Sequence, residues 1–113
     1  MILGIGTDIV EIERFKKLIF GSEKLRKRLF TESENLKPLH SLAARFAAKE
    51  AMQKALGSRH GLNWLDFEIL NNPDGSPIII VSGELKSHLK ENKIFISLSH
   101  ENLFATATVI ISS

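Results

Sequence analysis

The chain has 113 residues, of which 43% are hydrophobic and 25% charged, and its net charge is +2 at pH 7. This size predicts one domain over residues 1–113, and the lack of cysteine excludes disulfides and cysteine-bound metals and agrees with a cytoplasmic location. No apolar run approaches the roughly 20 residues of a membrane span, and the short apolar start is not preceded by a basic residue, so we expect no membrane contact and no signal peptide.

The first predicted element is a strand over residues 2–10, which contains Gly4 and Gly6. Glycines within a strand are typical of a bend or of a close approach by another backbone segment. Asp8 interrupts this apolar strand. Because a bare buried carboxylate is costly, Asp8 points outward at the strand end, is held by a positive group, or caps the next helix.

Two helices with a strongly basic composition are predicted next. Apolar residues follow an approximately helical spacing over residues 9–20, and Ser22 is a suitable N-cap for a short helix that ends at Leu29. Residues 14–28 hold seven basic side chains against Glu23 alone, a net charge of +6, while the rest of the chain carries −4. This segment is either a solvated helix surface or a site for nucleic acid, phosphate groups or an acidic protein.

A long central helix follows a polar loop at residues 31–40, which has room for one helical turn. We expect the helix to begin near Ser41 and to end at Gly57, a typical C-cap. One side of this helix is made of small or flexible residues, which allow close packing: Ala44, Ala47, Ala48, Ala51, Met52 and Ala55. The other side carries Phe46, Glu50 and Lys54, flanked by Lys49 and Gln53.

The second half of the chain predicts mainly strands. A basic loop at residues 58–61 leads to a hairpin of strands 64–70 and 78–81, joined by the turn sequence NNPDGSP. A helix over residues 82–91 precedes strands 94–98 and 104–111, with Ser99 and His100 in the turn between them. This order predicts an α+β fold in which a mostly antiparallel sheet packs on the long central helix.

The candidate chemistry lies on two distant acids. Asp8 and Glu50 can converge on one cation, and Mg²⁺ suits such a pair because it prefers oxygen ligands and is usually held by one or two carboxylates plus substrate phosphates. Lys54 would then meet a phosphate or act as a base. The structural alternative is that Glu50 and Lys54 are only a favourable exposed pair at i, i+4, and that His100 is an ordinary turn residue without a ligand.

Three stretches resemble the signatures of the holo-[acyl-carrier-protein] synthases, the small bacterial class of 4′-phosphopantetheinyl transferases. They are GIGTDIVEI at residues 4–12, FAAKEAMQKALG at residues 46–57 and SLSH at residues 97–100. Their order and spacing cover the whole chain. The resemblance implies the 4′-phosphopantetheinyl transferase fold and an enzyme that moves the phosphopantetheine arm of coenzyme A to a serine of apo-acyl carrier protein, with release of adenosine 3′,5′-bisphosphate.

The same resemblance implies the roles of individual residues. Asp8 and Glu50 match the family's Mg²⁺ ligands, and with Lys54 they match its catalytic residues. The residues that match the coenzyme A-binding positions of the family are Lys49, Lys54, Gly57, Ser99 and His100. Arg14, Arg26, Arg28 and Arg45 are expected to grip an acidic helix of the carrier protein. Family members are commonly homotrimers with active sites between subunits, so we expect the same assembly here.

One local departure and one alternative function remain. The family often continues after Gly57 with a small pair such as Thr-Gly, whereas Ser58, Arg59 and His60 follow it here; Arg59 can supply a new phosphate contact. The alternative to the enzyme is a small basic RNA-binding module. We expect no nucleic-acid partner, because Phe15 and Phe20 fit the helix core and the basic segment then lacks aromatic residues that stack on bases.

Overall fold

The computed structural model describes residues 1–57 and 61–113, so the predicted loop residues Ser58, Arg59 and His60 lie outside the described part. The elements, including two short 3₁₀ helices named η1 and η2, run in this order: β1 (Ile2–Glu11), α1 (Ile12–Phe20), α2 (Glu23–Leu29), η1 (Glu34–Leu36), α3 (Leu39–Leu56), η2 (Trp64–Asp66), β2 (Phe67–Asn71), β3 (Pro77–Val81), α4 (Gly83–Leu89), β4 (Lys93–His100) and β5 (Phe104–Ser112).

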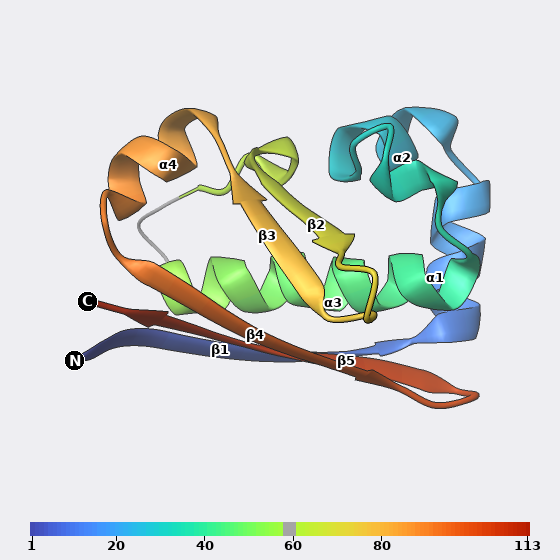
Figure 1. Ribbon diagram of the computed structural model, residues 1–113. Helices are drawn as coiled ribbons and strands as arrows, with labels where there is room; N and C mark the ends of the chain where they lie inside the picture. Colours follow the sequence, from blue (N-terminus) through green and yellow to red (C-terminus); the bar gives the residue numbers. More distant parts are fainter. Residues whose placement is uncertain (58–60) are drawn as a thin grey trace.

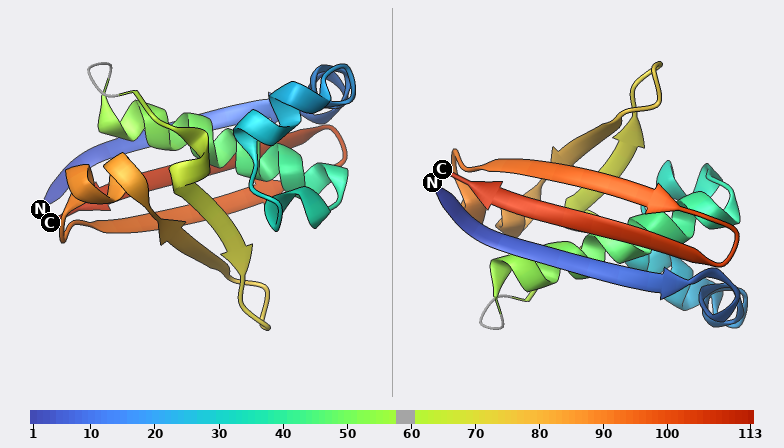
Figure 2. Two further views of the ribbon diagram at one scale, coloured as in Figure 1. Left: turned by 90° about the horizontal axis from the view of Figure 1, so that it is seen from above. Right: turned by 90° about the horizontal axis from the view of Figure 1, so that it is seen from below.

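Helix α3 lies along one face of a three-stranded antiparallel sheet in which β5 is the middle strand, between β1 and β4 (Figure 1). The β2–β3 hairpin forms a separate two-stranded antiparallel sheet on the other side of α3. The right-hand view of Figure 2 shows the outer face of the larger sheet in front of all the helices. The predicted α+β architecture on a long central helix is confirmed, although the strands are divided between two sheets.

The small residues of α3 allow the helix to lie unusually close to β1. Ala47, Ala48 and Ala51 are fully buried. A Cβ added at Gly6 would lie 1.8 Å from the carbonyl oxygen of Ala51, and one added at Gly4 would lie 2.1 Å from that of Ala55. The two glycines are therefore positions of close backbone approach, which is one of the two explanations that the sequence allowed.

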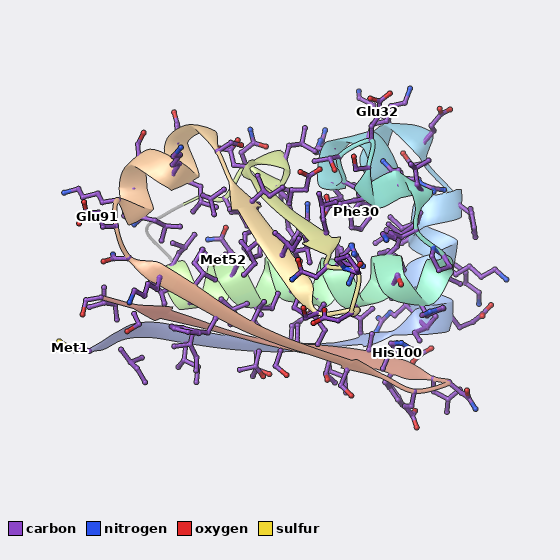
Figure 3. The ribbon with its side chains drawn as sticks, in the orientation of Figure 1. Met1, Phe30, Glu32, Met52, Glu91 and His100 are labelled. Atoms are coloured by element: carbon purple, nitrogen blue, oxygen red, sulfur yellow. The ribbon has the colours of Figure 1, made fainter. Side chains whose placement is uncertain are left out.

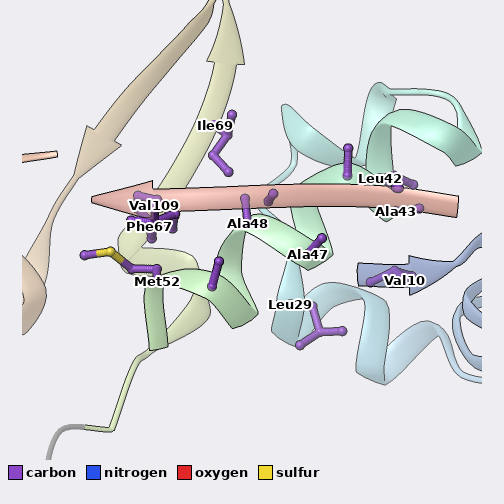
Figure 4. Close-up of a cluster of buried hydrophobic side chains, with 14 of the residues drawn as sticks. Val10, Leu29, Leu42, Ala43, Ala47, Ala48, Met52, Phe67, Ile69 and Val109 are labelled. Atoms are coloured by element: carbon purple, nitrogen blue, oxygen red, sulfur yellow. The ribbon is translucent and has the colours of Figure 1, made fainter. Parts of the chain in front are cut away.

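The core lies on both sides of α3, against the larger sheet and beneath the hairpin. Figure 4 shows Met52, Phe67 and Val109 grouped together, and all three are completely buried. At the other end of α3, Leu42 and Ala43 pack in the same continuous cluster. This core fixes the rotation of α3 about its axis, and so decides which of its polar residues reach the surface.

Local sequence signals gave some helix boundaries correctly and others incorrectly. Ser22 caps α2 as predicted, since its Oγ accepts a hydrogen bond of 3.1 Å from the Leu25 N–H. Helix α3 begins at Leu39 rather than near Ser41, because Pro38 takes the extended conformation (φ −68°, ψ 165°) that precedes a first helical turn. Gly57 ends α3 with a φ of 90°, which a glycine adopts without steric cost.

Two side-chain placements in the sequence analysis were wrong. Ser99 and His100 do not lie in a turn; they pair with Thr106 and Ala105 as the last residues of β4. Phe20 is 64% exposed at the end of α1, whereas Phe15 is buried as predicted. Within residues 1–57 and 61–113, no helix is long and apolar enough to cross a membrane.

Candidate functional site

Asp8 lies on the face of β1 that is turned toward α3. Side chains alternate between the two faces of a strand, and Gly6 and Val10 on either side of Asp8 are both buried on the helix side. Asp8 pairs with Ala107 within the sheet and stands three residues before the end of β1. It is thus neither at the strand end nor the cap of α1, whose N-cap is Glu11.

Lys54 supplies the positive group that holds Asp8. Its Nζ donates to Asp8 Oδ1 at 3.1 Å and to the Thr7 carbonyl oxygen at 2.9 Å. The side chain of Asp8 is only 20% exposed, whereas that of Lys54 is 55% exposed. Of the three explanations that the sequence left open for Asp8, the ion pair is the one observed.

Glu50 lies one helical turn before Lys54 and next to Ala51, the residue that touches Gly6 of β1. This packing brings Glu50 into the electrostatic field of Asp8. The pKa of Glu50 is raised above its ordinary value of 4.5, first because the carboxyl is partly buried and then because Asp8 repels its negative charge; Lys54 opposes this rise. A carboxylate whose negative charge is disfavoured by a neighbouring carboxylate is suited to share a cation with it.

An open hollow of about 640 Å³ lies beside these acids, between the end of β1, helix α1 and α3. Its lining combines three carboxylates, those of Asp8, Glu11 and Glu50, with basic and apolar side chains such as Arg14, Lys17 and Phe46. Among the described residues, no cluster of three or more His, Cys, Asp or Glu side chains suits a metal ion. A cation here would take its other ligands from water or from a substrate.

Lys49 does not reach this hollow, and its predicted contact with coenzyme A is wrong for this arrangement. The side chain is completely buried on another side of α3, where Nζ lies 2.7 Å from Glu34 Oε1. It also donates to the carbonyl oxygens of Leu29 and Trp64, each at 2.8 Å. The sequence suggested a flanking polar position, but the helix rotation places Lys49 in the interior.

The four arginines expected to bind a carrier protein have different environments. Arg14 and Arg28 are exposed and free to meet a partner protein. Arg26 is half-buried and donates to Asn35 through Nε at 2.7 Å and Nη2 at 3.0 Å. Arg45 is only 3% exposed and donates from Nε to the Ile69 carbonyl oxygen at 2.8 Å, so its assignment to the carrier-binding surface is corrected.

Ser99 and His100 are far from the acids within one chain. They face opposite sides of β4, and two strand spacings, about 10 Å, separate β4 from β1. Figure 3 shows His100 at the end of the sheet near the β4–β5 turn. Its ring centroid lies 4.6 Å from that of His40 on α3, a pairing that the sequence did not predict. Gly57 is the exposed end of α3, and it does not line the hollow.

Glu34 is the main polar residue that the sequence analysis missed. It is completely buried, and with Thr31 it makes reciprocal hydrogen bonds: Thr31 N–H to Glu34 Oε1 at 3.0 Å and Glu34 N–H to Thr31 Oγ1 at 3.2 Å. This is the pattern of a capping box, for which the sequence signal is a threonine followed three residues later by a glutamate. The TESE sequence at residues 31–34 carried that signal.

Comparisons with known proteins agree with this fold. Residues 4–108 match the family model described as the 4′-phosphopantetheinyl transferase superfamily. The chain is 43% identical to the holo-[acyl-carrier-protein] synthase of Leifsonia xyli, over 98% of this chain and 97% of that protein. It is 44% identical to the holo-[acyl-carrier-protein] synthase of Protochlamydia amoebophila, over the full length of both.

Solved structures give the same result. The Neisseria meningitidis holo-[acyl-carrier-protein] synthase superposes with a TM-score of 0.88 at 32% identity, over 100% of both chains. The Helicobacter pylori holo-[acyl-carrier-protein] synthase in complex with coenzyme A has a TM-score of 0.85 at 35% identity, over 96% of this chain and 99% of that one. The chain belongs to the 4′-phosphopantetheinyl transferase superfamily, and the relatives named above are holo-[acyl-carrier-protein] synthases. It is accordingly an enzyme of the transferase class.

Proposed function

We propose that this enzyme transfers the 4′-phosphopantetheine arm of coenzyme A to a serine of apo-acyl carrier protein, with Mg²⁺, and releases adenosine 3′,5′-bisphosphate. The observation that carries the proposal is that Asp8 and Glu50 line one hollow and that Lys54 forms an ion pair with Asp8. The names of the relatives and the coenzyme A complex of the Helicobacter pylori protein support it.

The residues fit a magnesium ion. Asp8 and Glu50 offer the oxygen ligands that Mg²⁺ prefers. Burial first and then the negative charge of Asp8 raise the pKa of Glu50, and a divalent cation bound between the two carboxylates would favour the charged form of Glu50. When bound, Mg²⁺ would neutralise the pyrophosphate and stabilise the departing bisphosphate. The other ligands would be water and pyrophosphate oxygens, because among the described residues no group of three His, Cys, Asp or Glu side chains suits a metal ion.

The reaction that we propose is a displacement at phosphorus. The serine Oγ forms a bond to the phosphorus that carries the pantetheine arm, and the bond from that phosphorus to the bridging oxygen breaks. Its electrons leave with adenosine 3′,5′-bisphosphate. Lys54, as an ammonium ion, offers a positive charge to the phosphate oxygens, and Glu50 can then accept the serine proton; a neutral Lys54 would be the alternative base.

A direct test is to incubate the protein with Mg²⁺, coenzyme A and an apo-acyl carrier protein, and to measure the intact mass of the carrier. We expect a mass increase of one phosphopantetheine group and an equal amount of adenosine 3′,5′-bisphosphate. Both products should disappear when a chelator removes the metal and return when Mg²⁺ is added. Unmodified carrier in the presence of Mg²⁺, across several carrier proteins, would refute the proposed reaction.

We propose that the carrier docks on the exposed basic surface of α1 and α2, around Arg14 and Arg28. Replacing Arg28 by glutamate should raise the KM for the carrier about 10-fold, which corresponds to about 1.4 kcal/mol. Charged groups at the rim of an interface steer association, so the effect should shrink at high salt. The KM for coenzyme A should not change.

The control for this prediction is Lys86→Glu, which makes the same change of charge on exposed α4, at the other end of the molecule (Figure 1). It should leave the KM for the carrier unchanged. An equal rise in KM for both variants would mean that only the net charge of the protein matters, and would remove the docking surface from α2.

We propose a homotrimer in which the outer face of the larger sheet is the contact between copies. Ile5 and Ile9 are each 63% exposed on this face, and Phe95 is 55% exposed. Replacing Phe95 by lysine should convert the trimer to monomers and remove activity, as measured by sedimentation velocity and product formation. Leu36→Lys, at a residue that is 86% exposed on η1, should leave the trimer intact. A trimer that survives Phe95→Lys would point to another contact.

The proposed assembly explains how Ser99 and His100 can serve the active site, because an adjacent copy would bring its β4 to the hollow. Mixing two inactive variants tests this directly. Subunits with Asp8→Asn and subunits with His100→Ala should regain part of the activity when they form mixed trimers. Failure of such subunits to complement each other after verified exchange would mean that one chain supplies the complete site.

RNA binding is kept as a second candidate because Phe20 is exposed beside the basic helices. It would appear as tight binding of single-stranded RNA with a steep dependence on salt, unaffected by Asp8→Asn. Weak binding that a high salt concentration abolishes, together with transfer to the carrier, would leave only the enzymatic function.

A further inference from the structure

A buried ion pair ties α3 to the segment that carries the basic surface. Lys49 Nζ and Glu34 Oε1 are 2.7 Å apart, and both side chains are 0% exposed. Lys49 also donates to the carbonyl oxygens of Leu29 and Trp64. These three bonds use every proton of the ammonium group.

The carboxylate of Glu34 is bonded as completely as its partner. Besides Lys49, Oε1 accepts the Thr31 N–H at 3.0 Å, and Oε2 accepts the Ile69 N–H at 3.0 Å. Among the described residues, no buried side-chain nitrogen or oxygen lacks a hydrogen-bond partner. The pair therefore joins the end of α2, the turn before η1, helix α3, η2 and β2 at a single point.

The position of this pair in the sequence links it to the candidate site. Lys49 directly precedes Glu50, and Leu29 directly follows Arg28. One ammonium group thus connects the helical turn that bears Glu50 with the end of the helix that bears Arg28. The Lys49 ammonium also lies 5.4 Å from the centroid of the Phe30 ring, and Phe30 packs edge-on against Phe15 of α1 with centroids 6.2 Å apart.

General stability is a poor explanation for such a pair. Removing two charges from water costs about as much as their attraction returns, and well-packed apolar residues of similar volume are often equally stable or more stable. A fully bonded ion pair does, however, fix geometry, because its hydrogen bonds are satisfied in one arrangement only. Its value to the enzyme is then the orientation that it imposes.

We propose that Lys49, through Glu34 and the Leu29 carbonyl, is a positioning residue that holds α2 at a fixed orientation to α3, so that a docked carrier protein presents its serine to the Asp8–Glu50 site. The inference rests on the proposed function, since it concerns the second substrate of that reaction. It assigns Lys49 to the geometry of the carrier, in place of the contact with coenzyme A expected from the sequence.

The test uses the double variant Lys49→Met with Glu34→Gln. Both charges are removed together and the side-chain volumes are kept, so neither an unpaired buried charge nor a large cavity is left behind. We expect the KM for apo-carrier to rise, or kcat to fall, by about 10–100-fold, because small misplacements of a reacting group have effects of that size. The dissociation constant for coenzyme A, measured by calorimetry, should stay within about twofold of wild type, well below the tenfold that corresponds to 1.4 kcal/mol.

Hydrogen exchange gives a readout that does not depend on activity. Backbone amides of α2, residues 23–29, should exchange faster in the double variant, while those of α3 around Met52 keep their protection. Leu85→Ala, in the buried face of α4, serves as the control for lost stability. At a matched loss of melting temperature it should change neither the KM for the carrier nor exchange in α2.

The outcomes separate the inference from the proposed function. A double variant with unchanged carrier KM, unchanged kcat per folded molecule and unchanged α2 exchange overturns the positioning role alone, provided that wild type transfers the arm. The positioning role is also overturned if the activity of the double variant falls only in proportion to its fraction of folded protein, as expected for the Leu85→Ala control. Wild-type protein that modifies no carrier overturns the proposed function and this inference together.

Discussion

Replacing Glu50 by glutamine should reduce transfer by at least about 100-fold and yet raise the melting temperature of the metal-free protein at neutral pH. The loss follows because even a residue that only orients a metal ligand contributes about 10–100-fold. The gain in stability follows from the pKa of Glu50, which burial and the charge of Asp8 raise in the folded state. Product formation and thermal unfolding measure the two effects separately.

The sign of the pH dependence is fixed by the direction of this shift. Because the folded state holds the Glu50 proton more tightly than the unfolded state, the stabilising contribution is complete below the ordinary pKa of 4.5 and is lost as the pH rises through the raised value. The melting temperatures of wild type and Glu50→Gln should therefore converge in acid. Toward neutral pH, the melting temperature of Glu50→Gln should become higher than that of wild type.

Adding Mg²⁺ provides the control for this prediction. A ligand that binds only the folded state stabilises it, so adding Mg²⁺ in the presence of coenzyme A should further raise the melting temperature of wild type and have little further effect on Glu50→Gln. Equal stabilisation of both proteins by Mg²⁺, or near-normal turnover of the variant, would remove Glu50 from the metal site. A variant less stable than wild type at neutral pH would contradict the electrostatic account of its pKa.

Replacing Gly6 by alanine should destabilise the protein by more than about 3 kcal/mol, the upper end of the usual range for overpacked cores. The added Cβ would lie 1.8 Å from the Ala51 carbonyl oxygen, and this atom belongs to a helix backbone that cannot move aside alone. The expected result is a large drop in the urea midpoint or failure to fold. Since Asp8 and Glu50 flank this contact, any folded fraction should also bind Mg²⁺ poorly.

Gly61→Ala is the matched control, because an added Cβ there meets no atom of residues 1–57 and 61–113 within 4 Å. It should change stability by no more than about 1 kcal/mol, in the stabilising direction, through a lower entropy of the unfolded chain. A Gly6→Ala protein with a urea midpoint close to that of wild type would mean that β1 and α3 are not packed as closely as the structure has them.

The sequence was most informative where one residue type has one physical use. Alanines at helical spacing predicted the buried side of α3, and Gly57 predicted its end. The same pattern correctly separated Glu50 and Lys54 from the core. These features of α3 depend on local geometry, which the order of residues along a helix determines.

The sequence was least informative where tertiary contacts decide the position of a charge. The family resemblance implied that Lys49 and Arg45 contact ligands, yet buried carbonyl groups and Glu34 hold them in the interior. Ser99 and His100 were placed in a turn because a polar stretch follows β4, but the pairing with β5 extends the strand through them. Phe20 was assigned to the core from an approximate spacing that its exposed position contradicts.

The adjacency of Lys49 and Glu50 limits how this gene can change in length. Adding or deleting one residue within α3 ahead of this pair would rotate everything after it by about 100° relative to the core. Such a rotation would turn the side chain of Lys49 toward solvent and move the carboxylate of Glu50 away from Asp8. Insertions and deletions in homologous genes should therefore be rare between codons 39 and 56, and should accumulate instead in the connections outside this helix.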